Sequence, residues 1–191
     1  KSDGFSLHPG KYGTGLFLSP PTDNWIGDPF DFKQWEGISD ITPVDTPPPV
    51  GRGGVMRIDP SGGGEAMNYK TGQACAGKTL TFSVWVRSDQ PHPGFFKIQD
   101  NNNNEANSGQ IFITGEWQQV EITRSFSSNA SGQAIAIIWP ADYNRSKHEP
   151  IEVWGAQVEE RSFATMPVEG SRAGGRLKHG KIGPSVEDAG S

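Results

Sequence analysis

A strict two-residue alternation between Leu80 and Arg87 constrains the fold of this chain more than any other feature. Apolar residues occupy every second position of this segment, and the intervening positions hold Thr81, Ser83, Trp85 and Arg87. Successive side chains of a β-strand point to opposite faces of its sheet. The segment therefore predicts a strand whose apolar positions face a core and whose Trp85 faces away from it.

Short segments of this kind recur along the chain at intervals of roughly 8–14 residues, and no amphipathic helix lies between them. The 25 Gly and 15 Pro favour many turns, and 191 residues suffice for one sizeable domain with flanking segments. The pattern predicts an all-β fold, a two-sheet antiparallel jelly-roll sandwich. The expected strands lie at residues 38–44, 54–60, 66–69, 80–87, 95–99, 110–114, 117–126, 133–139 and 151–158.

The distribution of Gly, Pro and periodic segments predicts three parts. Residues 1–22 are expected to form an extended N-terminal arm, residues 23–161 the β-domain and residues 162–191 a C-terminal tail, because the flanking parts lack sustained periodicity. Extended chain cannot offset about 1–2 kcal/mol of backbone entropy per residue without contacts. The arm and the tail are therefore expected to lie on a partner surface when they are ordered.

Charge and motif content argue against several classes of function. A formal net charge of −5 disfavours binding to a nucleic-acid backbone, and the single cysteine, Cys75, excludes an internal disulfide framework. No apolar run approaches the roughly 20 residues needed to cross a bilayer. The sequence has no GxSxG nucleophile turn and no HExxH metal motif, so we expect no enzymatic activity.

Three segments carry a resemblance to known proteins. KTLTFSVWVRS, at residues 78–88, and GEWQQVEITRSFS, at residues 115–127, resemble strands of family 4/9-type carbohydrate-binding jelly rolls. VWGAQVEERSFATMPVEG, at residues 153–170, resembles the closing segment of tail-fibre and other virion proteins of tailed bacteriophages. The sequence departs from that closing motif at Glu160 and Arg161, where the family usually has Gly.

The resemblance implies a jelly roll that adheres rather than catalyses. It implies a bacteriophage virion protein on the exterior of the particle, either a capsid decoration or head-fibre protein or a tail-fibre component, that binds host glycans or stabilises the particle. The implied partners are other virion proteins, further copies of the chain, such as in a homotrimer, and a cell-surface glycan, but neither nucleic acid nor membrane. The alternative is a carbohydrate-binding module of a polysaccharide-active enzyme.

Trp85 is the expected platform for a glycan, because the C–H face of a sugar stacks on an aromatic ring while its hydroxyls need hydrogen-bonding partners. Those partners are expected from the same strand face and from the amide-rich loop at residues 100–109, namely Thr81, Ser83, Arg87, Asn102 and Asn103. Two alternatives stay open. In the first, Trp85 packs under a loop or at a subunit interface instead of binding a glycan. In the second, the asparagines form only a solvated turn.

No cofactor is required by the sequence. A structural calcium ion is an alternative, because related jelly rolls often carry one and carboxylates occur in several expected loops. The sequence has no contiguous calcium-binding loop, so a site would have to be assembled from distant segments. Its oxygen ligands would come from Asp28, Asp31, Asp59 and Glu159.

Overall fold

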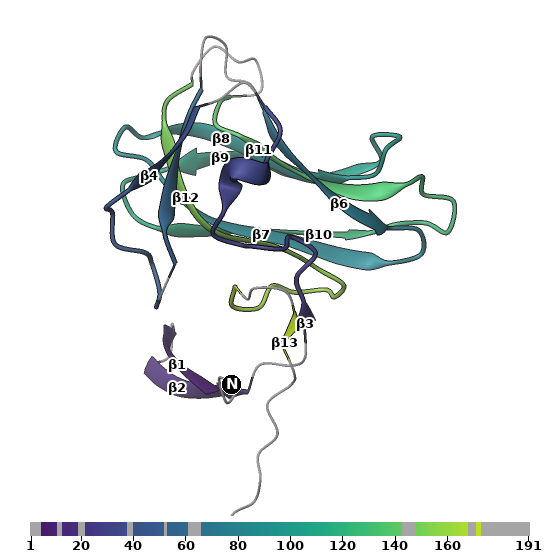
Figure 1. Cartoon of the computed structure of the whole chain (residues 1–191), viewed down its shortest axis with the longest axis horizontal. Coiled ribbons are helices and arrows are strands. Elements are labelled where there is room, and N and C mark those ends of the chain that lie inside the picture. The colour runs from purple at the N-terminus through teal and green to yellow at the C-terminus, as the bar shows by residue number, and fades with distance from the viewer. Residues whose placement is uncertain are drawn as a thin grey trace, which may run out of the picture.

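Two antiparallel sheets packed face to face form the body of the molecule (Figure 1). The computed structural model describes residues 5–10, 13–18, 22–37, 40–51, 53–60, 66–142, 148–167 and 171–172. The five-stranded sheet has the order β10-β7-β12-β5-β4, and the four-stranded sheet has the order β6-β11-β8-β9. This arrangement confirms the predicted all-β jelly-roll sandwich.

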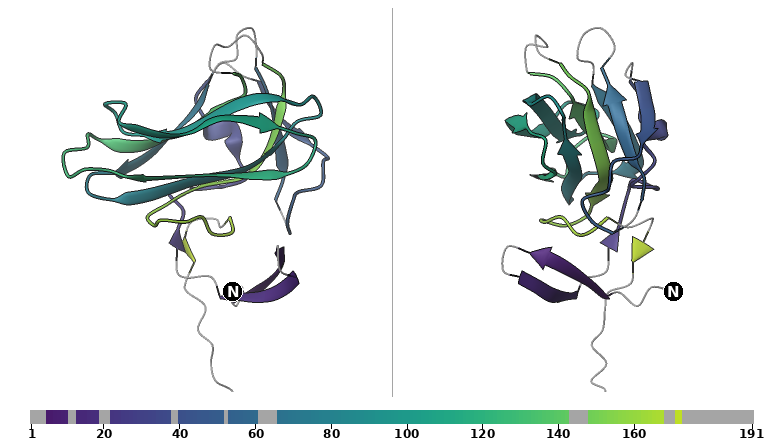
Figure 2. Two further views of the ribbon diagram at one scale, coloured as in Figure 1. Left: turned by 180° about the vertical axis from the view of Figure 1, so that it is seen from behind. Right: turned by 90° about the vertical axis from the view of Figure 1, so that its left-hand side faces the viewer.

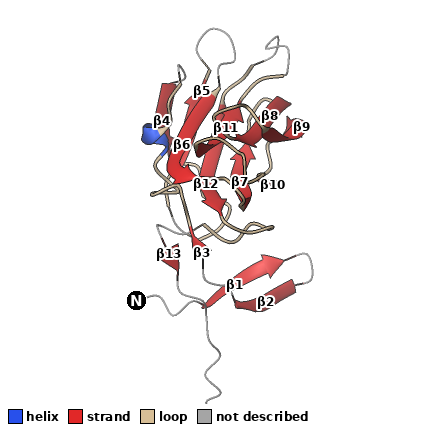
Figure 3. Cartoon of the chain, turned by 90° about the vertical axis from the view of Figure 1, so that its right-hand side faces the viewer, coloured by secondary structure: helices blue, strands red, loops and turns tan. Residues whose placement is uncertain are grey.

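The strand bounds agree with the expected positions, and several strands are longer than predicted. The five-stranded sheet comprises β4 (Asp40–Val44), β5 (Val55–Asp59), β7 (Thr79–Arg87), β10 (Gln118–Ser125) and β12 (Ile151–Glu159). The four-stranded sheet comprises β6 (Met67–Ala74), β8 (His92–Gln99), β9 (Glu105–Ile113) and β11 (Gln133–Trp139). Within the described ranges the one helical element is the short 3-10 turn η1 (Phe32–Gln34) (Figure 3), and no helix there is long and apolar enough to span a membrane.

The core lies between the inner faces of the two sheets. The alternation in β7 is confirmed, because its apolar side chains are fully buried while the next positions point to the outer face. Burying a large apolar side chain contributes about 1.5–3 kcal/mol, so this layer supplies much of the driving force for folding. The inner face combines Leu80, Phe82, Val84 and Val86 of β7 with Phe96 and Ile98 of β8 and Ala136 and Ile138 of β11.

The aromatic segment at residues 24–35 completes this core. Trp25, Ile26, Phe32 and Trp35 are buried. The ring of Trp35 stacks on that of Phe32 at a centroid separation of 5.4 Å. The side chain of Asp31, just before η1, accepts a hydrogen bond from the backbone N–H of Lys33 and so caps the start of this turn. Trp25, Phe32 and Trp35 therefore belong to the hydrophobic core although they lie outside the regular strands.

Two short antiparallel pairs lie outside the sandwich sheets (Figure 2). β1 (Phe5–Gly10) pairs with β2 (Gly13–Leu18), so the region predicted to be an extended arm contains a hairpin. β3 (Thr22–Asp23) pairs with β13 (Ser171–Arg172), which joins the segment before the sandwich to the segment after it. The division of the chain at residues 22 and 161 stays a prediction.

The polar stretch expected to be one loop from residue 100 to residue 109 is partly a strand. The loop ends at Asn104, because β9 begins at Glu105 and pairs with β8. Asparagine disfavours strands in general, but pairing to β8 along its length outweighs that preference here. The pairing is irregular between Phe95 and Lys97, where β9 has one extra residue and Gly109 adopts a φ of 64°.

Candidate functional site

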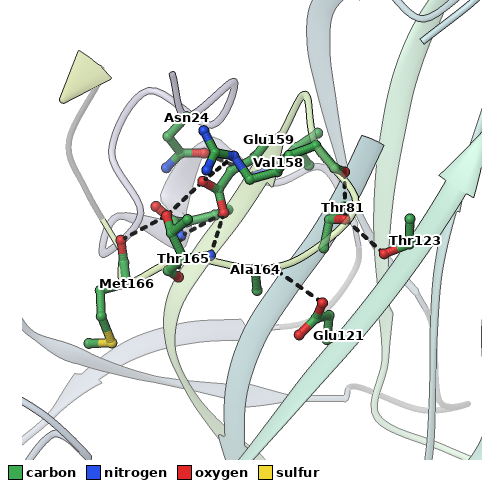
Figure 4. A network of polar contacts seen from close by, with 11 residues as sticks. Asn24, Thr81, Glu121, Thr123, Val158, Glu159, Ala164, Thr165 and Met166 are labelled. Carbon is green, nitrogen blue, oxygen red and sulfur yellow. Dashed lines mark hydrogen bonds and ion pairs between the residues drawn. The ribbon is translucent and has the colours of Figure 1, made fainter. Parts of the chain in front are cut away.

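The sandwich has two outer faces, and they differ in what lies over them. A segment at residues 160–167, here called the cover segment, lies on the outer face of the five-stranded sheet (Figure 4). Thr81 of β7 donates its hydroxyl to the carbonyl of Arg161 at 2.8 Å. The backbone N–H of Ala164 donates to the carboxylate of Glu121 on β10 at 3.0 Å. The cover segment is therefore bonded to two adjacent strands of this sheet.

A buried carboxylate holds the cover segment in place. Glu159 of β12 has no exposed surface, and Thr165 donates to it from the backbone N–H at 2.8 Å and from the hydroxyl at 2.7 Å. Arg161 lies 3.5 Å from the same carboxylate, which supplies a positive charge. Gln157 donates from its amide to the carbonyl of Thr165 at 2.9 Å. Burial of an ionised group is costly unless it is paired and hydrogen-bonded, and Glu159 is both.

An irregularity in β12 shapes the surface on which the cover segment lies. The register with β7 shifts between Trp154 and Gln157, and Gly155 adopts a φ of 66° there. A Cβ atom on Gly155 would lie 2.5 Å from Cγ of Pro167, so the cover segment passes directly over this glycine. The shift keeps Trp154 and Gln157 on the same outer face, opposite Trp85 and Ser83 respectively.

A second segment, the proline loop at residues 45–50, crosses the other half of the same face. Thr46 donates its hydroxyl to Glu152 of β12 at 3.0 Å, and Trp117, just before β10, donates its indole N–H to the carbonyl of Pro47 at 3.1 Å. The loop follows β4 at one edge of the sheet and reaches the strand at the opposite edge. Nearby, Phe30 packs on Trp154 at a ring-centroid distance of 5.2 Å.

The residues predicted as a glycan platform do not form one accessible surface. Thr81 and Ser83 are buried beneath the cover segment, while Trp85 and Arg87 are half-buried. Arg87 forms ion pairs with Asp89 and, at 3.4 Å, with Glu152. Thr81 and Ser83 are therefore not accessible to a ligand, and the role of Trp85 in glycan binding stays a prediction.

The two predicted asparagines belong to the other sheet. Asn102 and Asn103 are exposed in the turn between β8 and β9, whereas Trp85 lies on β7 of the five-stranded sheet. Asn103 adopts a φ of 61° and accepts a hydrogen bond from the amide of Gln99 at 2.9 Å. The turn prediction for these asparagines is correct, but they cannot act together with Trp85.

The four expected calcium ligands do not converge. Asp28 and Asp31 each accept a hydrogen bond from a nearby backbone N–H, Asp59 lies 3.9 Å from Arg57, and Glu159 is bonded to the cover segment. Among the residues that the structure describes, no group of three or more acidic, histidine or cysteine side chains is arranged to hold a metal ion.

The outer face of the four-stranded sheet presents a different surface. The register places Trp139 of β11 beside Phe95 of β8 and Ile137 beside Lys97. Gln110 of β9 lies on the other side of Phe95. Residues directly opposite each other in an antiparallel pair share a face. We call this surface the aromatic face, and its described side chains are Asn68, Lys70, Pro93, Phe95, Lys97, Gln99, Gln110, Phe112, Ile135, Ile137 and Trp139.

The centre of the aromatic face is a pair of rings with an ammonium group over both. Trp139 and Phe95 meet edge to face, with ring centroids 6.3 Å apart and an interplanar angle of 79°. The Nζ atom of Lys97 lies 5.7 Å from the centroid of Trp139 and 5.8 Å from that of Phe95. Phe112 on the edge strand β9 is 60% exposed.

A buried aspartate orders the loop at one end of this face. Asp100 accepts hydrogen bonds from the backbone of Asn102, Asn104 and Ser131 at 2.9–3.0 Å, and from the side-chain amide of Asn104. Burial alone raises the pKa of Asp100, but these four hydrogen bonds outweigh burial and lower the pKa to about 2. The carboxylate therefore ties the β8–β9 turn to the β10–β11 turn. Burial and the nearby Asp100 raise the pKa of Cys75, whose side chain is buried.

Sequence reasoning did not assign the aromatic face. Residues 133–139 read QAIAIIW and are apolar on both faces, so alternation does not show which side Trp139 occupies. The sequence does carry one signal, the difference in size between alternate positions of this strand. Trp139 shares its face with Ile135 and Ile137, while the inward-facing residues Ala134, Ala136 and Ile138 are smaller on average.

Comparisons with known proteins agree with this architecture. No protein-family model matches the chain, and no curated protein matches it. The xylan-binding CBM22-1 domain of Xyn10C from Paenibacillus barcinonensis is similar in structure, with a TM-score of 0.52 and 8% sequence identity over 74% of this chain and 94% of that one. The C-terminal family 22 carbohydrate-binding module of Xyn10B from Clostridium thermocellum has a TM-score of 0.52 and 12% identity, over 86% and 99% of the two chains.

A third similar structure is TmCBM61 in complex with β-1,4-galactotriose, with a TM-score of 0.52 and 13% identity over 72% of this chain and 99% of that one. Identities this low establish a shared fold and nothing finer. The chain therefore has the β-sandwich fold found in carbohydrate-binding modules. The expected relation to bacteriophage virion proteins stays a prediction.

Proposed function

We propose that this chain is a non-enzymatic carbohydrate-binding module that binds a polysaccharide through its aromatic face. The observation that carries the proposal is the contrast between the two outer faces. The five-stranded sheet is overlaid by the cover segment and the proline loop, whereas the four-stranded sheet presents the half-buried Trp139 and the exposed Phe112. A soluble ligand needs a surface that it can reach.

The chemistry of the aromatic face suits a sugar. An aromatic ring offers its π-face to the C–H groups of a pyranose, and nearby amides offer both donors and acceptors for the hydroxyls. Gln110 is exposed next to Phe95, and Gln99, which is buried, lies four residues farther along β8. The face is spread across β6, β11, β8 and β9 rather than concentrated at one point. That distribution favours an extended chain of several sugar units over a monosaccharide.

The similar structures suggest which polysaccharides to test first. One is described as a xylan-binding domain, and another is in complex with β-1,4-galactotriose. Soluble xylan and β-1,4-galactan are therefore suitable first probes, in isothermal titration calorimetry or affinity gel electrophoresis. We expect saturable binding without release of reducing sugar, since the proposed role is adhesion and not hydrolysis.

Two exposed phenylalanines, one on each side of the sandwich, provide a matched test. Phe112 lies on the aromatic face and is 60% exposed, while Phe163 lies on the cover segment and is 49% exposed. Trp139→Ala and Phe112→Ala are expected to weaken binding by about tenfold each, the equivalent of one lost stacking contact. Phe163→Ala is expected to bind as the unmodified chain does. Weaker binding in Phe163→Ala alone would move the site to the other sheet, and no binding to any polysaccharide would refute the proposal.

Display on the exterior of a virion is a second candidate role, and it is compatible with glycan binding. The resemblance of residues 153–170 to the closing segment of bacteriophage virion proteins supports it. Mass spectrometry of purified particles, together with antibody labelling in the electron microscope, tests it directly. Absence of the chain from the particles would leave the module of a polysaccharide-active enzyme as the preferred context.

A further inference from the structure

Gln110 is an exposed amide on the aromatic face. It lies on the edge strand β9, opposite Phe95 of β8 and two residues from the exposed Phe112. No hydrogen bond joins its side chain to any residue that the structure describes. Its oxygen and its nitrogen are therefore both available to a ligand that lies on this part of the sheet.

The other polar side chains described on this face are engaged or less accessible. Gln99 is buried and hydrogen-bonded, Lys70 is ion-paired, and the ammonium of Lys97 lies over two aromatic rings. Asn68 is half-buried and lies on β6, at the opposite edge of the sheet from β9. Gln110 is therefore the described amide of this face that a ligand can reach most directly.

Phe112 and Gln110 are close enough to contact the same sugar. Residues two apart on a strand point to the same face of the sheet, with a Cα separation of about 7 Å. The ring of Phe112 is 60% exposed, so a pyranose can stack its C–H face there. The hydroxyls at the rim of that pyranose then come within reach of the amide of Gln110.

A glutamine amide suits a pair of neighbouring hydroxyls. Its oxygen accepts a hydrogen bond and its nitrogen donates one, and each sugar hydroxyl can do both. A β-1,4-linked chain keeps two neighbouring ring hydroxyls free on each unit. A β-1,3-linked chain uses one of these in its linkage, so its remaining ring hydroxyls are not neighbours. A site that pairs with a hydroxyl discriminates against a ligand that lacks it.

We propose that the aromatic face prefers polysaccharides whose sugars carry two free neighbouring hydroxyls, as β-1,4-linked chains do, and that Gln110 determines this specificity. The inference rests on the proposed function and names the class of glycan that the same surface prefers. Phe112 supplies a stacking surface, and Gln110 donates to one hydroxyl of the pair and accepts from the other.

The experiment compares two ligands that differ only in linkage. Cellohexaose and laminarihexaose are uncharged chains of the same sugar and of equal length, joined by β-1,4 and β-1,3 linkages respectively. Each is titrated into the full chain in a calorimeter. Cellohexaose is expected to bind about tenfold more tightly, which is the equivalent of one or two neutral hydrogen bonds.

Two exposed glutamines on opposite outer faces provide matched variants. Gln110→Met keeps the length of the side chain but removes both hydrogen-bonding groups. It is expected to lose about tenfold in affinity for cellohexaose and nothing for laminarihexaose, so that the preference disappears. Gln119 of β10 is exposed and lies opposite Trp85, on the outer face of the other sheet. Gln119→Met should bind both ligands as the unmodified chain does. Melting temperatures establish that both variants are folded.

The possible outcomes distinguish this inference from the proposed function. A missing preference in the unmodified chain, or a preference that persists in Gln110→Met, overturns the role of Gln110. Glycan binding by the aromatic face then still stands, provided that Phe112→Ala weakens it. Binding of xylan or galactan without binding of cellohexaose also overturns this inference alone.

Two further results would overturn both proposals. Weaker binding in Gln119→Met, with no change in Gln110→Met, would place the ligand on the five-stranded sheet. Failure of the chain to bind xylan, galactan and both hexasaccharides would refute the proposed function, and this inference with it.

Discussion

Thr165 donates both its backbone N–H and its hydroxyl to the two carboxylate oxygens of Glu159, at 2.8 and 2.7 Å. The two residues are six positions apart, and both are buried. This pair fastens the cover segment to β12, so that the outer face of the five-stranded sheet is closed by the chain that follows its own last strand. The cover is therefore a part of the folded domain rather than an appendage.

Removing the Thr165 hydroxyl should destabilise the domain. Thr165→Val keeps the shape of the side chain and leaves one oxygen of the buried Glu159 without its donor, so we expect the free energy of unfolding to fall by about 1–3 kcal/mol. Urea denaturation measures the change. Thr165→Ser retains the hydroxyl and serves as the control. Equal stabilities of the Val and Ser variants would show that this hydrogen bond does not hold the cover segment.

Substitutions at two glycines with similar backbone angles distinguish the cost of backbone strain from the cost of a steric clash. Gly155 and Gly72 have φ values of 66° and 70°, but a Cβ would meet Pro167 at Gly155 and nothing within 4 Å at Gly72. Gly72→Ala should therefore cost about 1–2 kcal/mol from the left-handed backbone alone. Gly155→Ala should cost more, because Pro167 must also move. Thermal unfolding of both variants tests this order, and the reverse order would mean that the cover segment does not press on β12.

Trp85 is expected to act in packing and not in ligand binding. Trp85→Ala removes a half-buried ring from the outer face of β7, so we expect a loss of about 2–4 kcal/mol in stability. Polysaccharide affinity should be unchanged at a temperature where the variant is folded. A variant that keeps its melting temperature but loses glycan binding would restore Trp85 as the platform.

Asp100 should make the domain sensitive to acid. Its folded-state pKa of about 2 lies below the value of about 4 in an unfolded chain, so its charged form stabilises the fold above pH 4. That contribution is lost as the pH falls from about 4 to about 2. The difference in unfolding free energy between the unmodified chain and Asp100→Asn should therefore be large at pH 6 and shrink toward pH 2.5. A difference that does not vary with pH would contradict this assignment.

The sandwich could be predicted because its strands carry local patterns. In β7 the inward and outward positions differ so sharply in polarity that the strand, its facing and its burial all follow from residues 80–87. β9 was only partly predicted, since its first half contains Asn107, Ser108 and Gly109 and is a strand because of its pairing with β8. The hairpin of β1 and β2 was missed for a related reason, since its glycines and proline read as irregular chain.

The candidate site could not be predicted from local pattern, because it depends on which outer face remains open. Alternation correctly placed Trp85 on an outer face. It does not reveal that Trp117 donates a hydrogen bond to Pro47, because the two residues are 70 positions apart in sequence. Nor does it reveal that Gly155 permits Pro167 to cross β12. The first contact joins segments that are far apart along the chain, and the second depends on the left-handed backbone of Gly155. Both lie on the outer face of the five-stranded sheet, whereas Trp139 lies on the outer face of the other sheet.

The pairing of β3 with β13 has a mechanical consequence. Thr22 lies opposite Arg172 and Asp23 opposite Ser171, so the chain enters and leaves the sandwich side by side, at about one strand spacing of 5 Å. Tension applied from both directions along the polypeptide would pull on the pair of Thr22 and Arg172 first. The two residue pairs of this short ladder would then separate one after the other. The load would reach the sandwich, and any ligand held on it, only after this junction had parted.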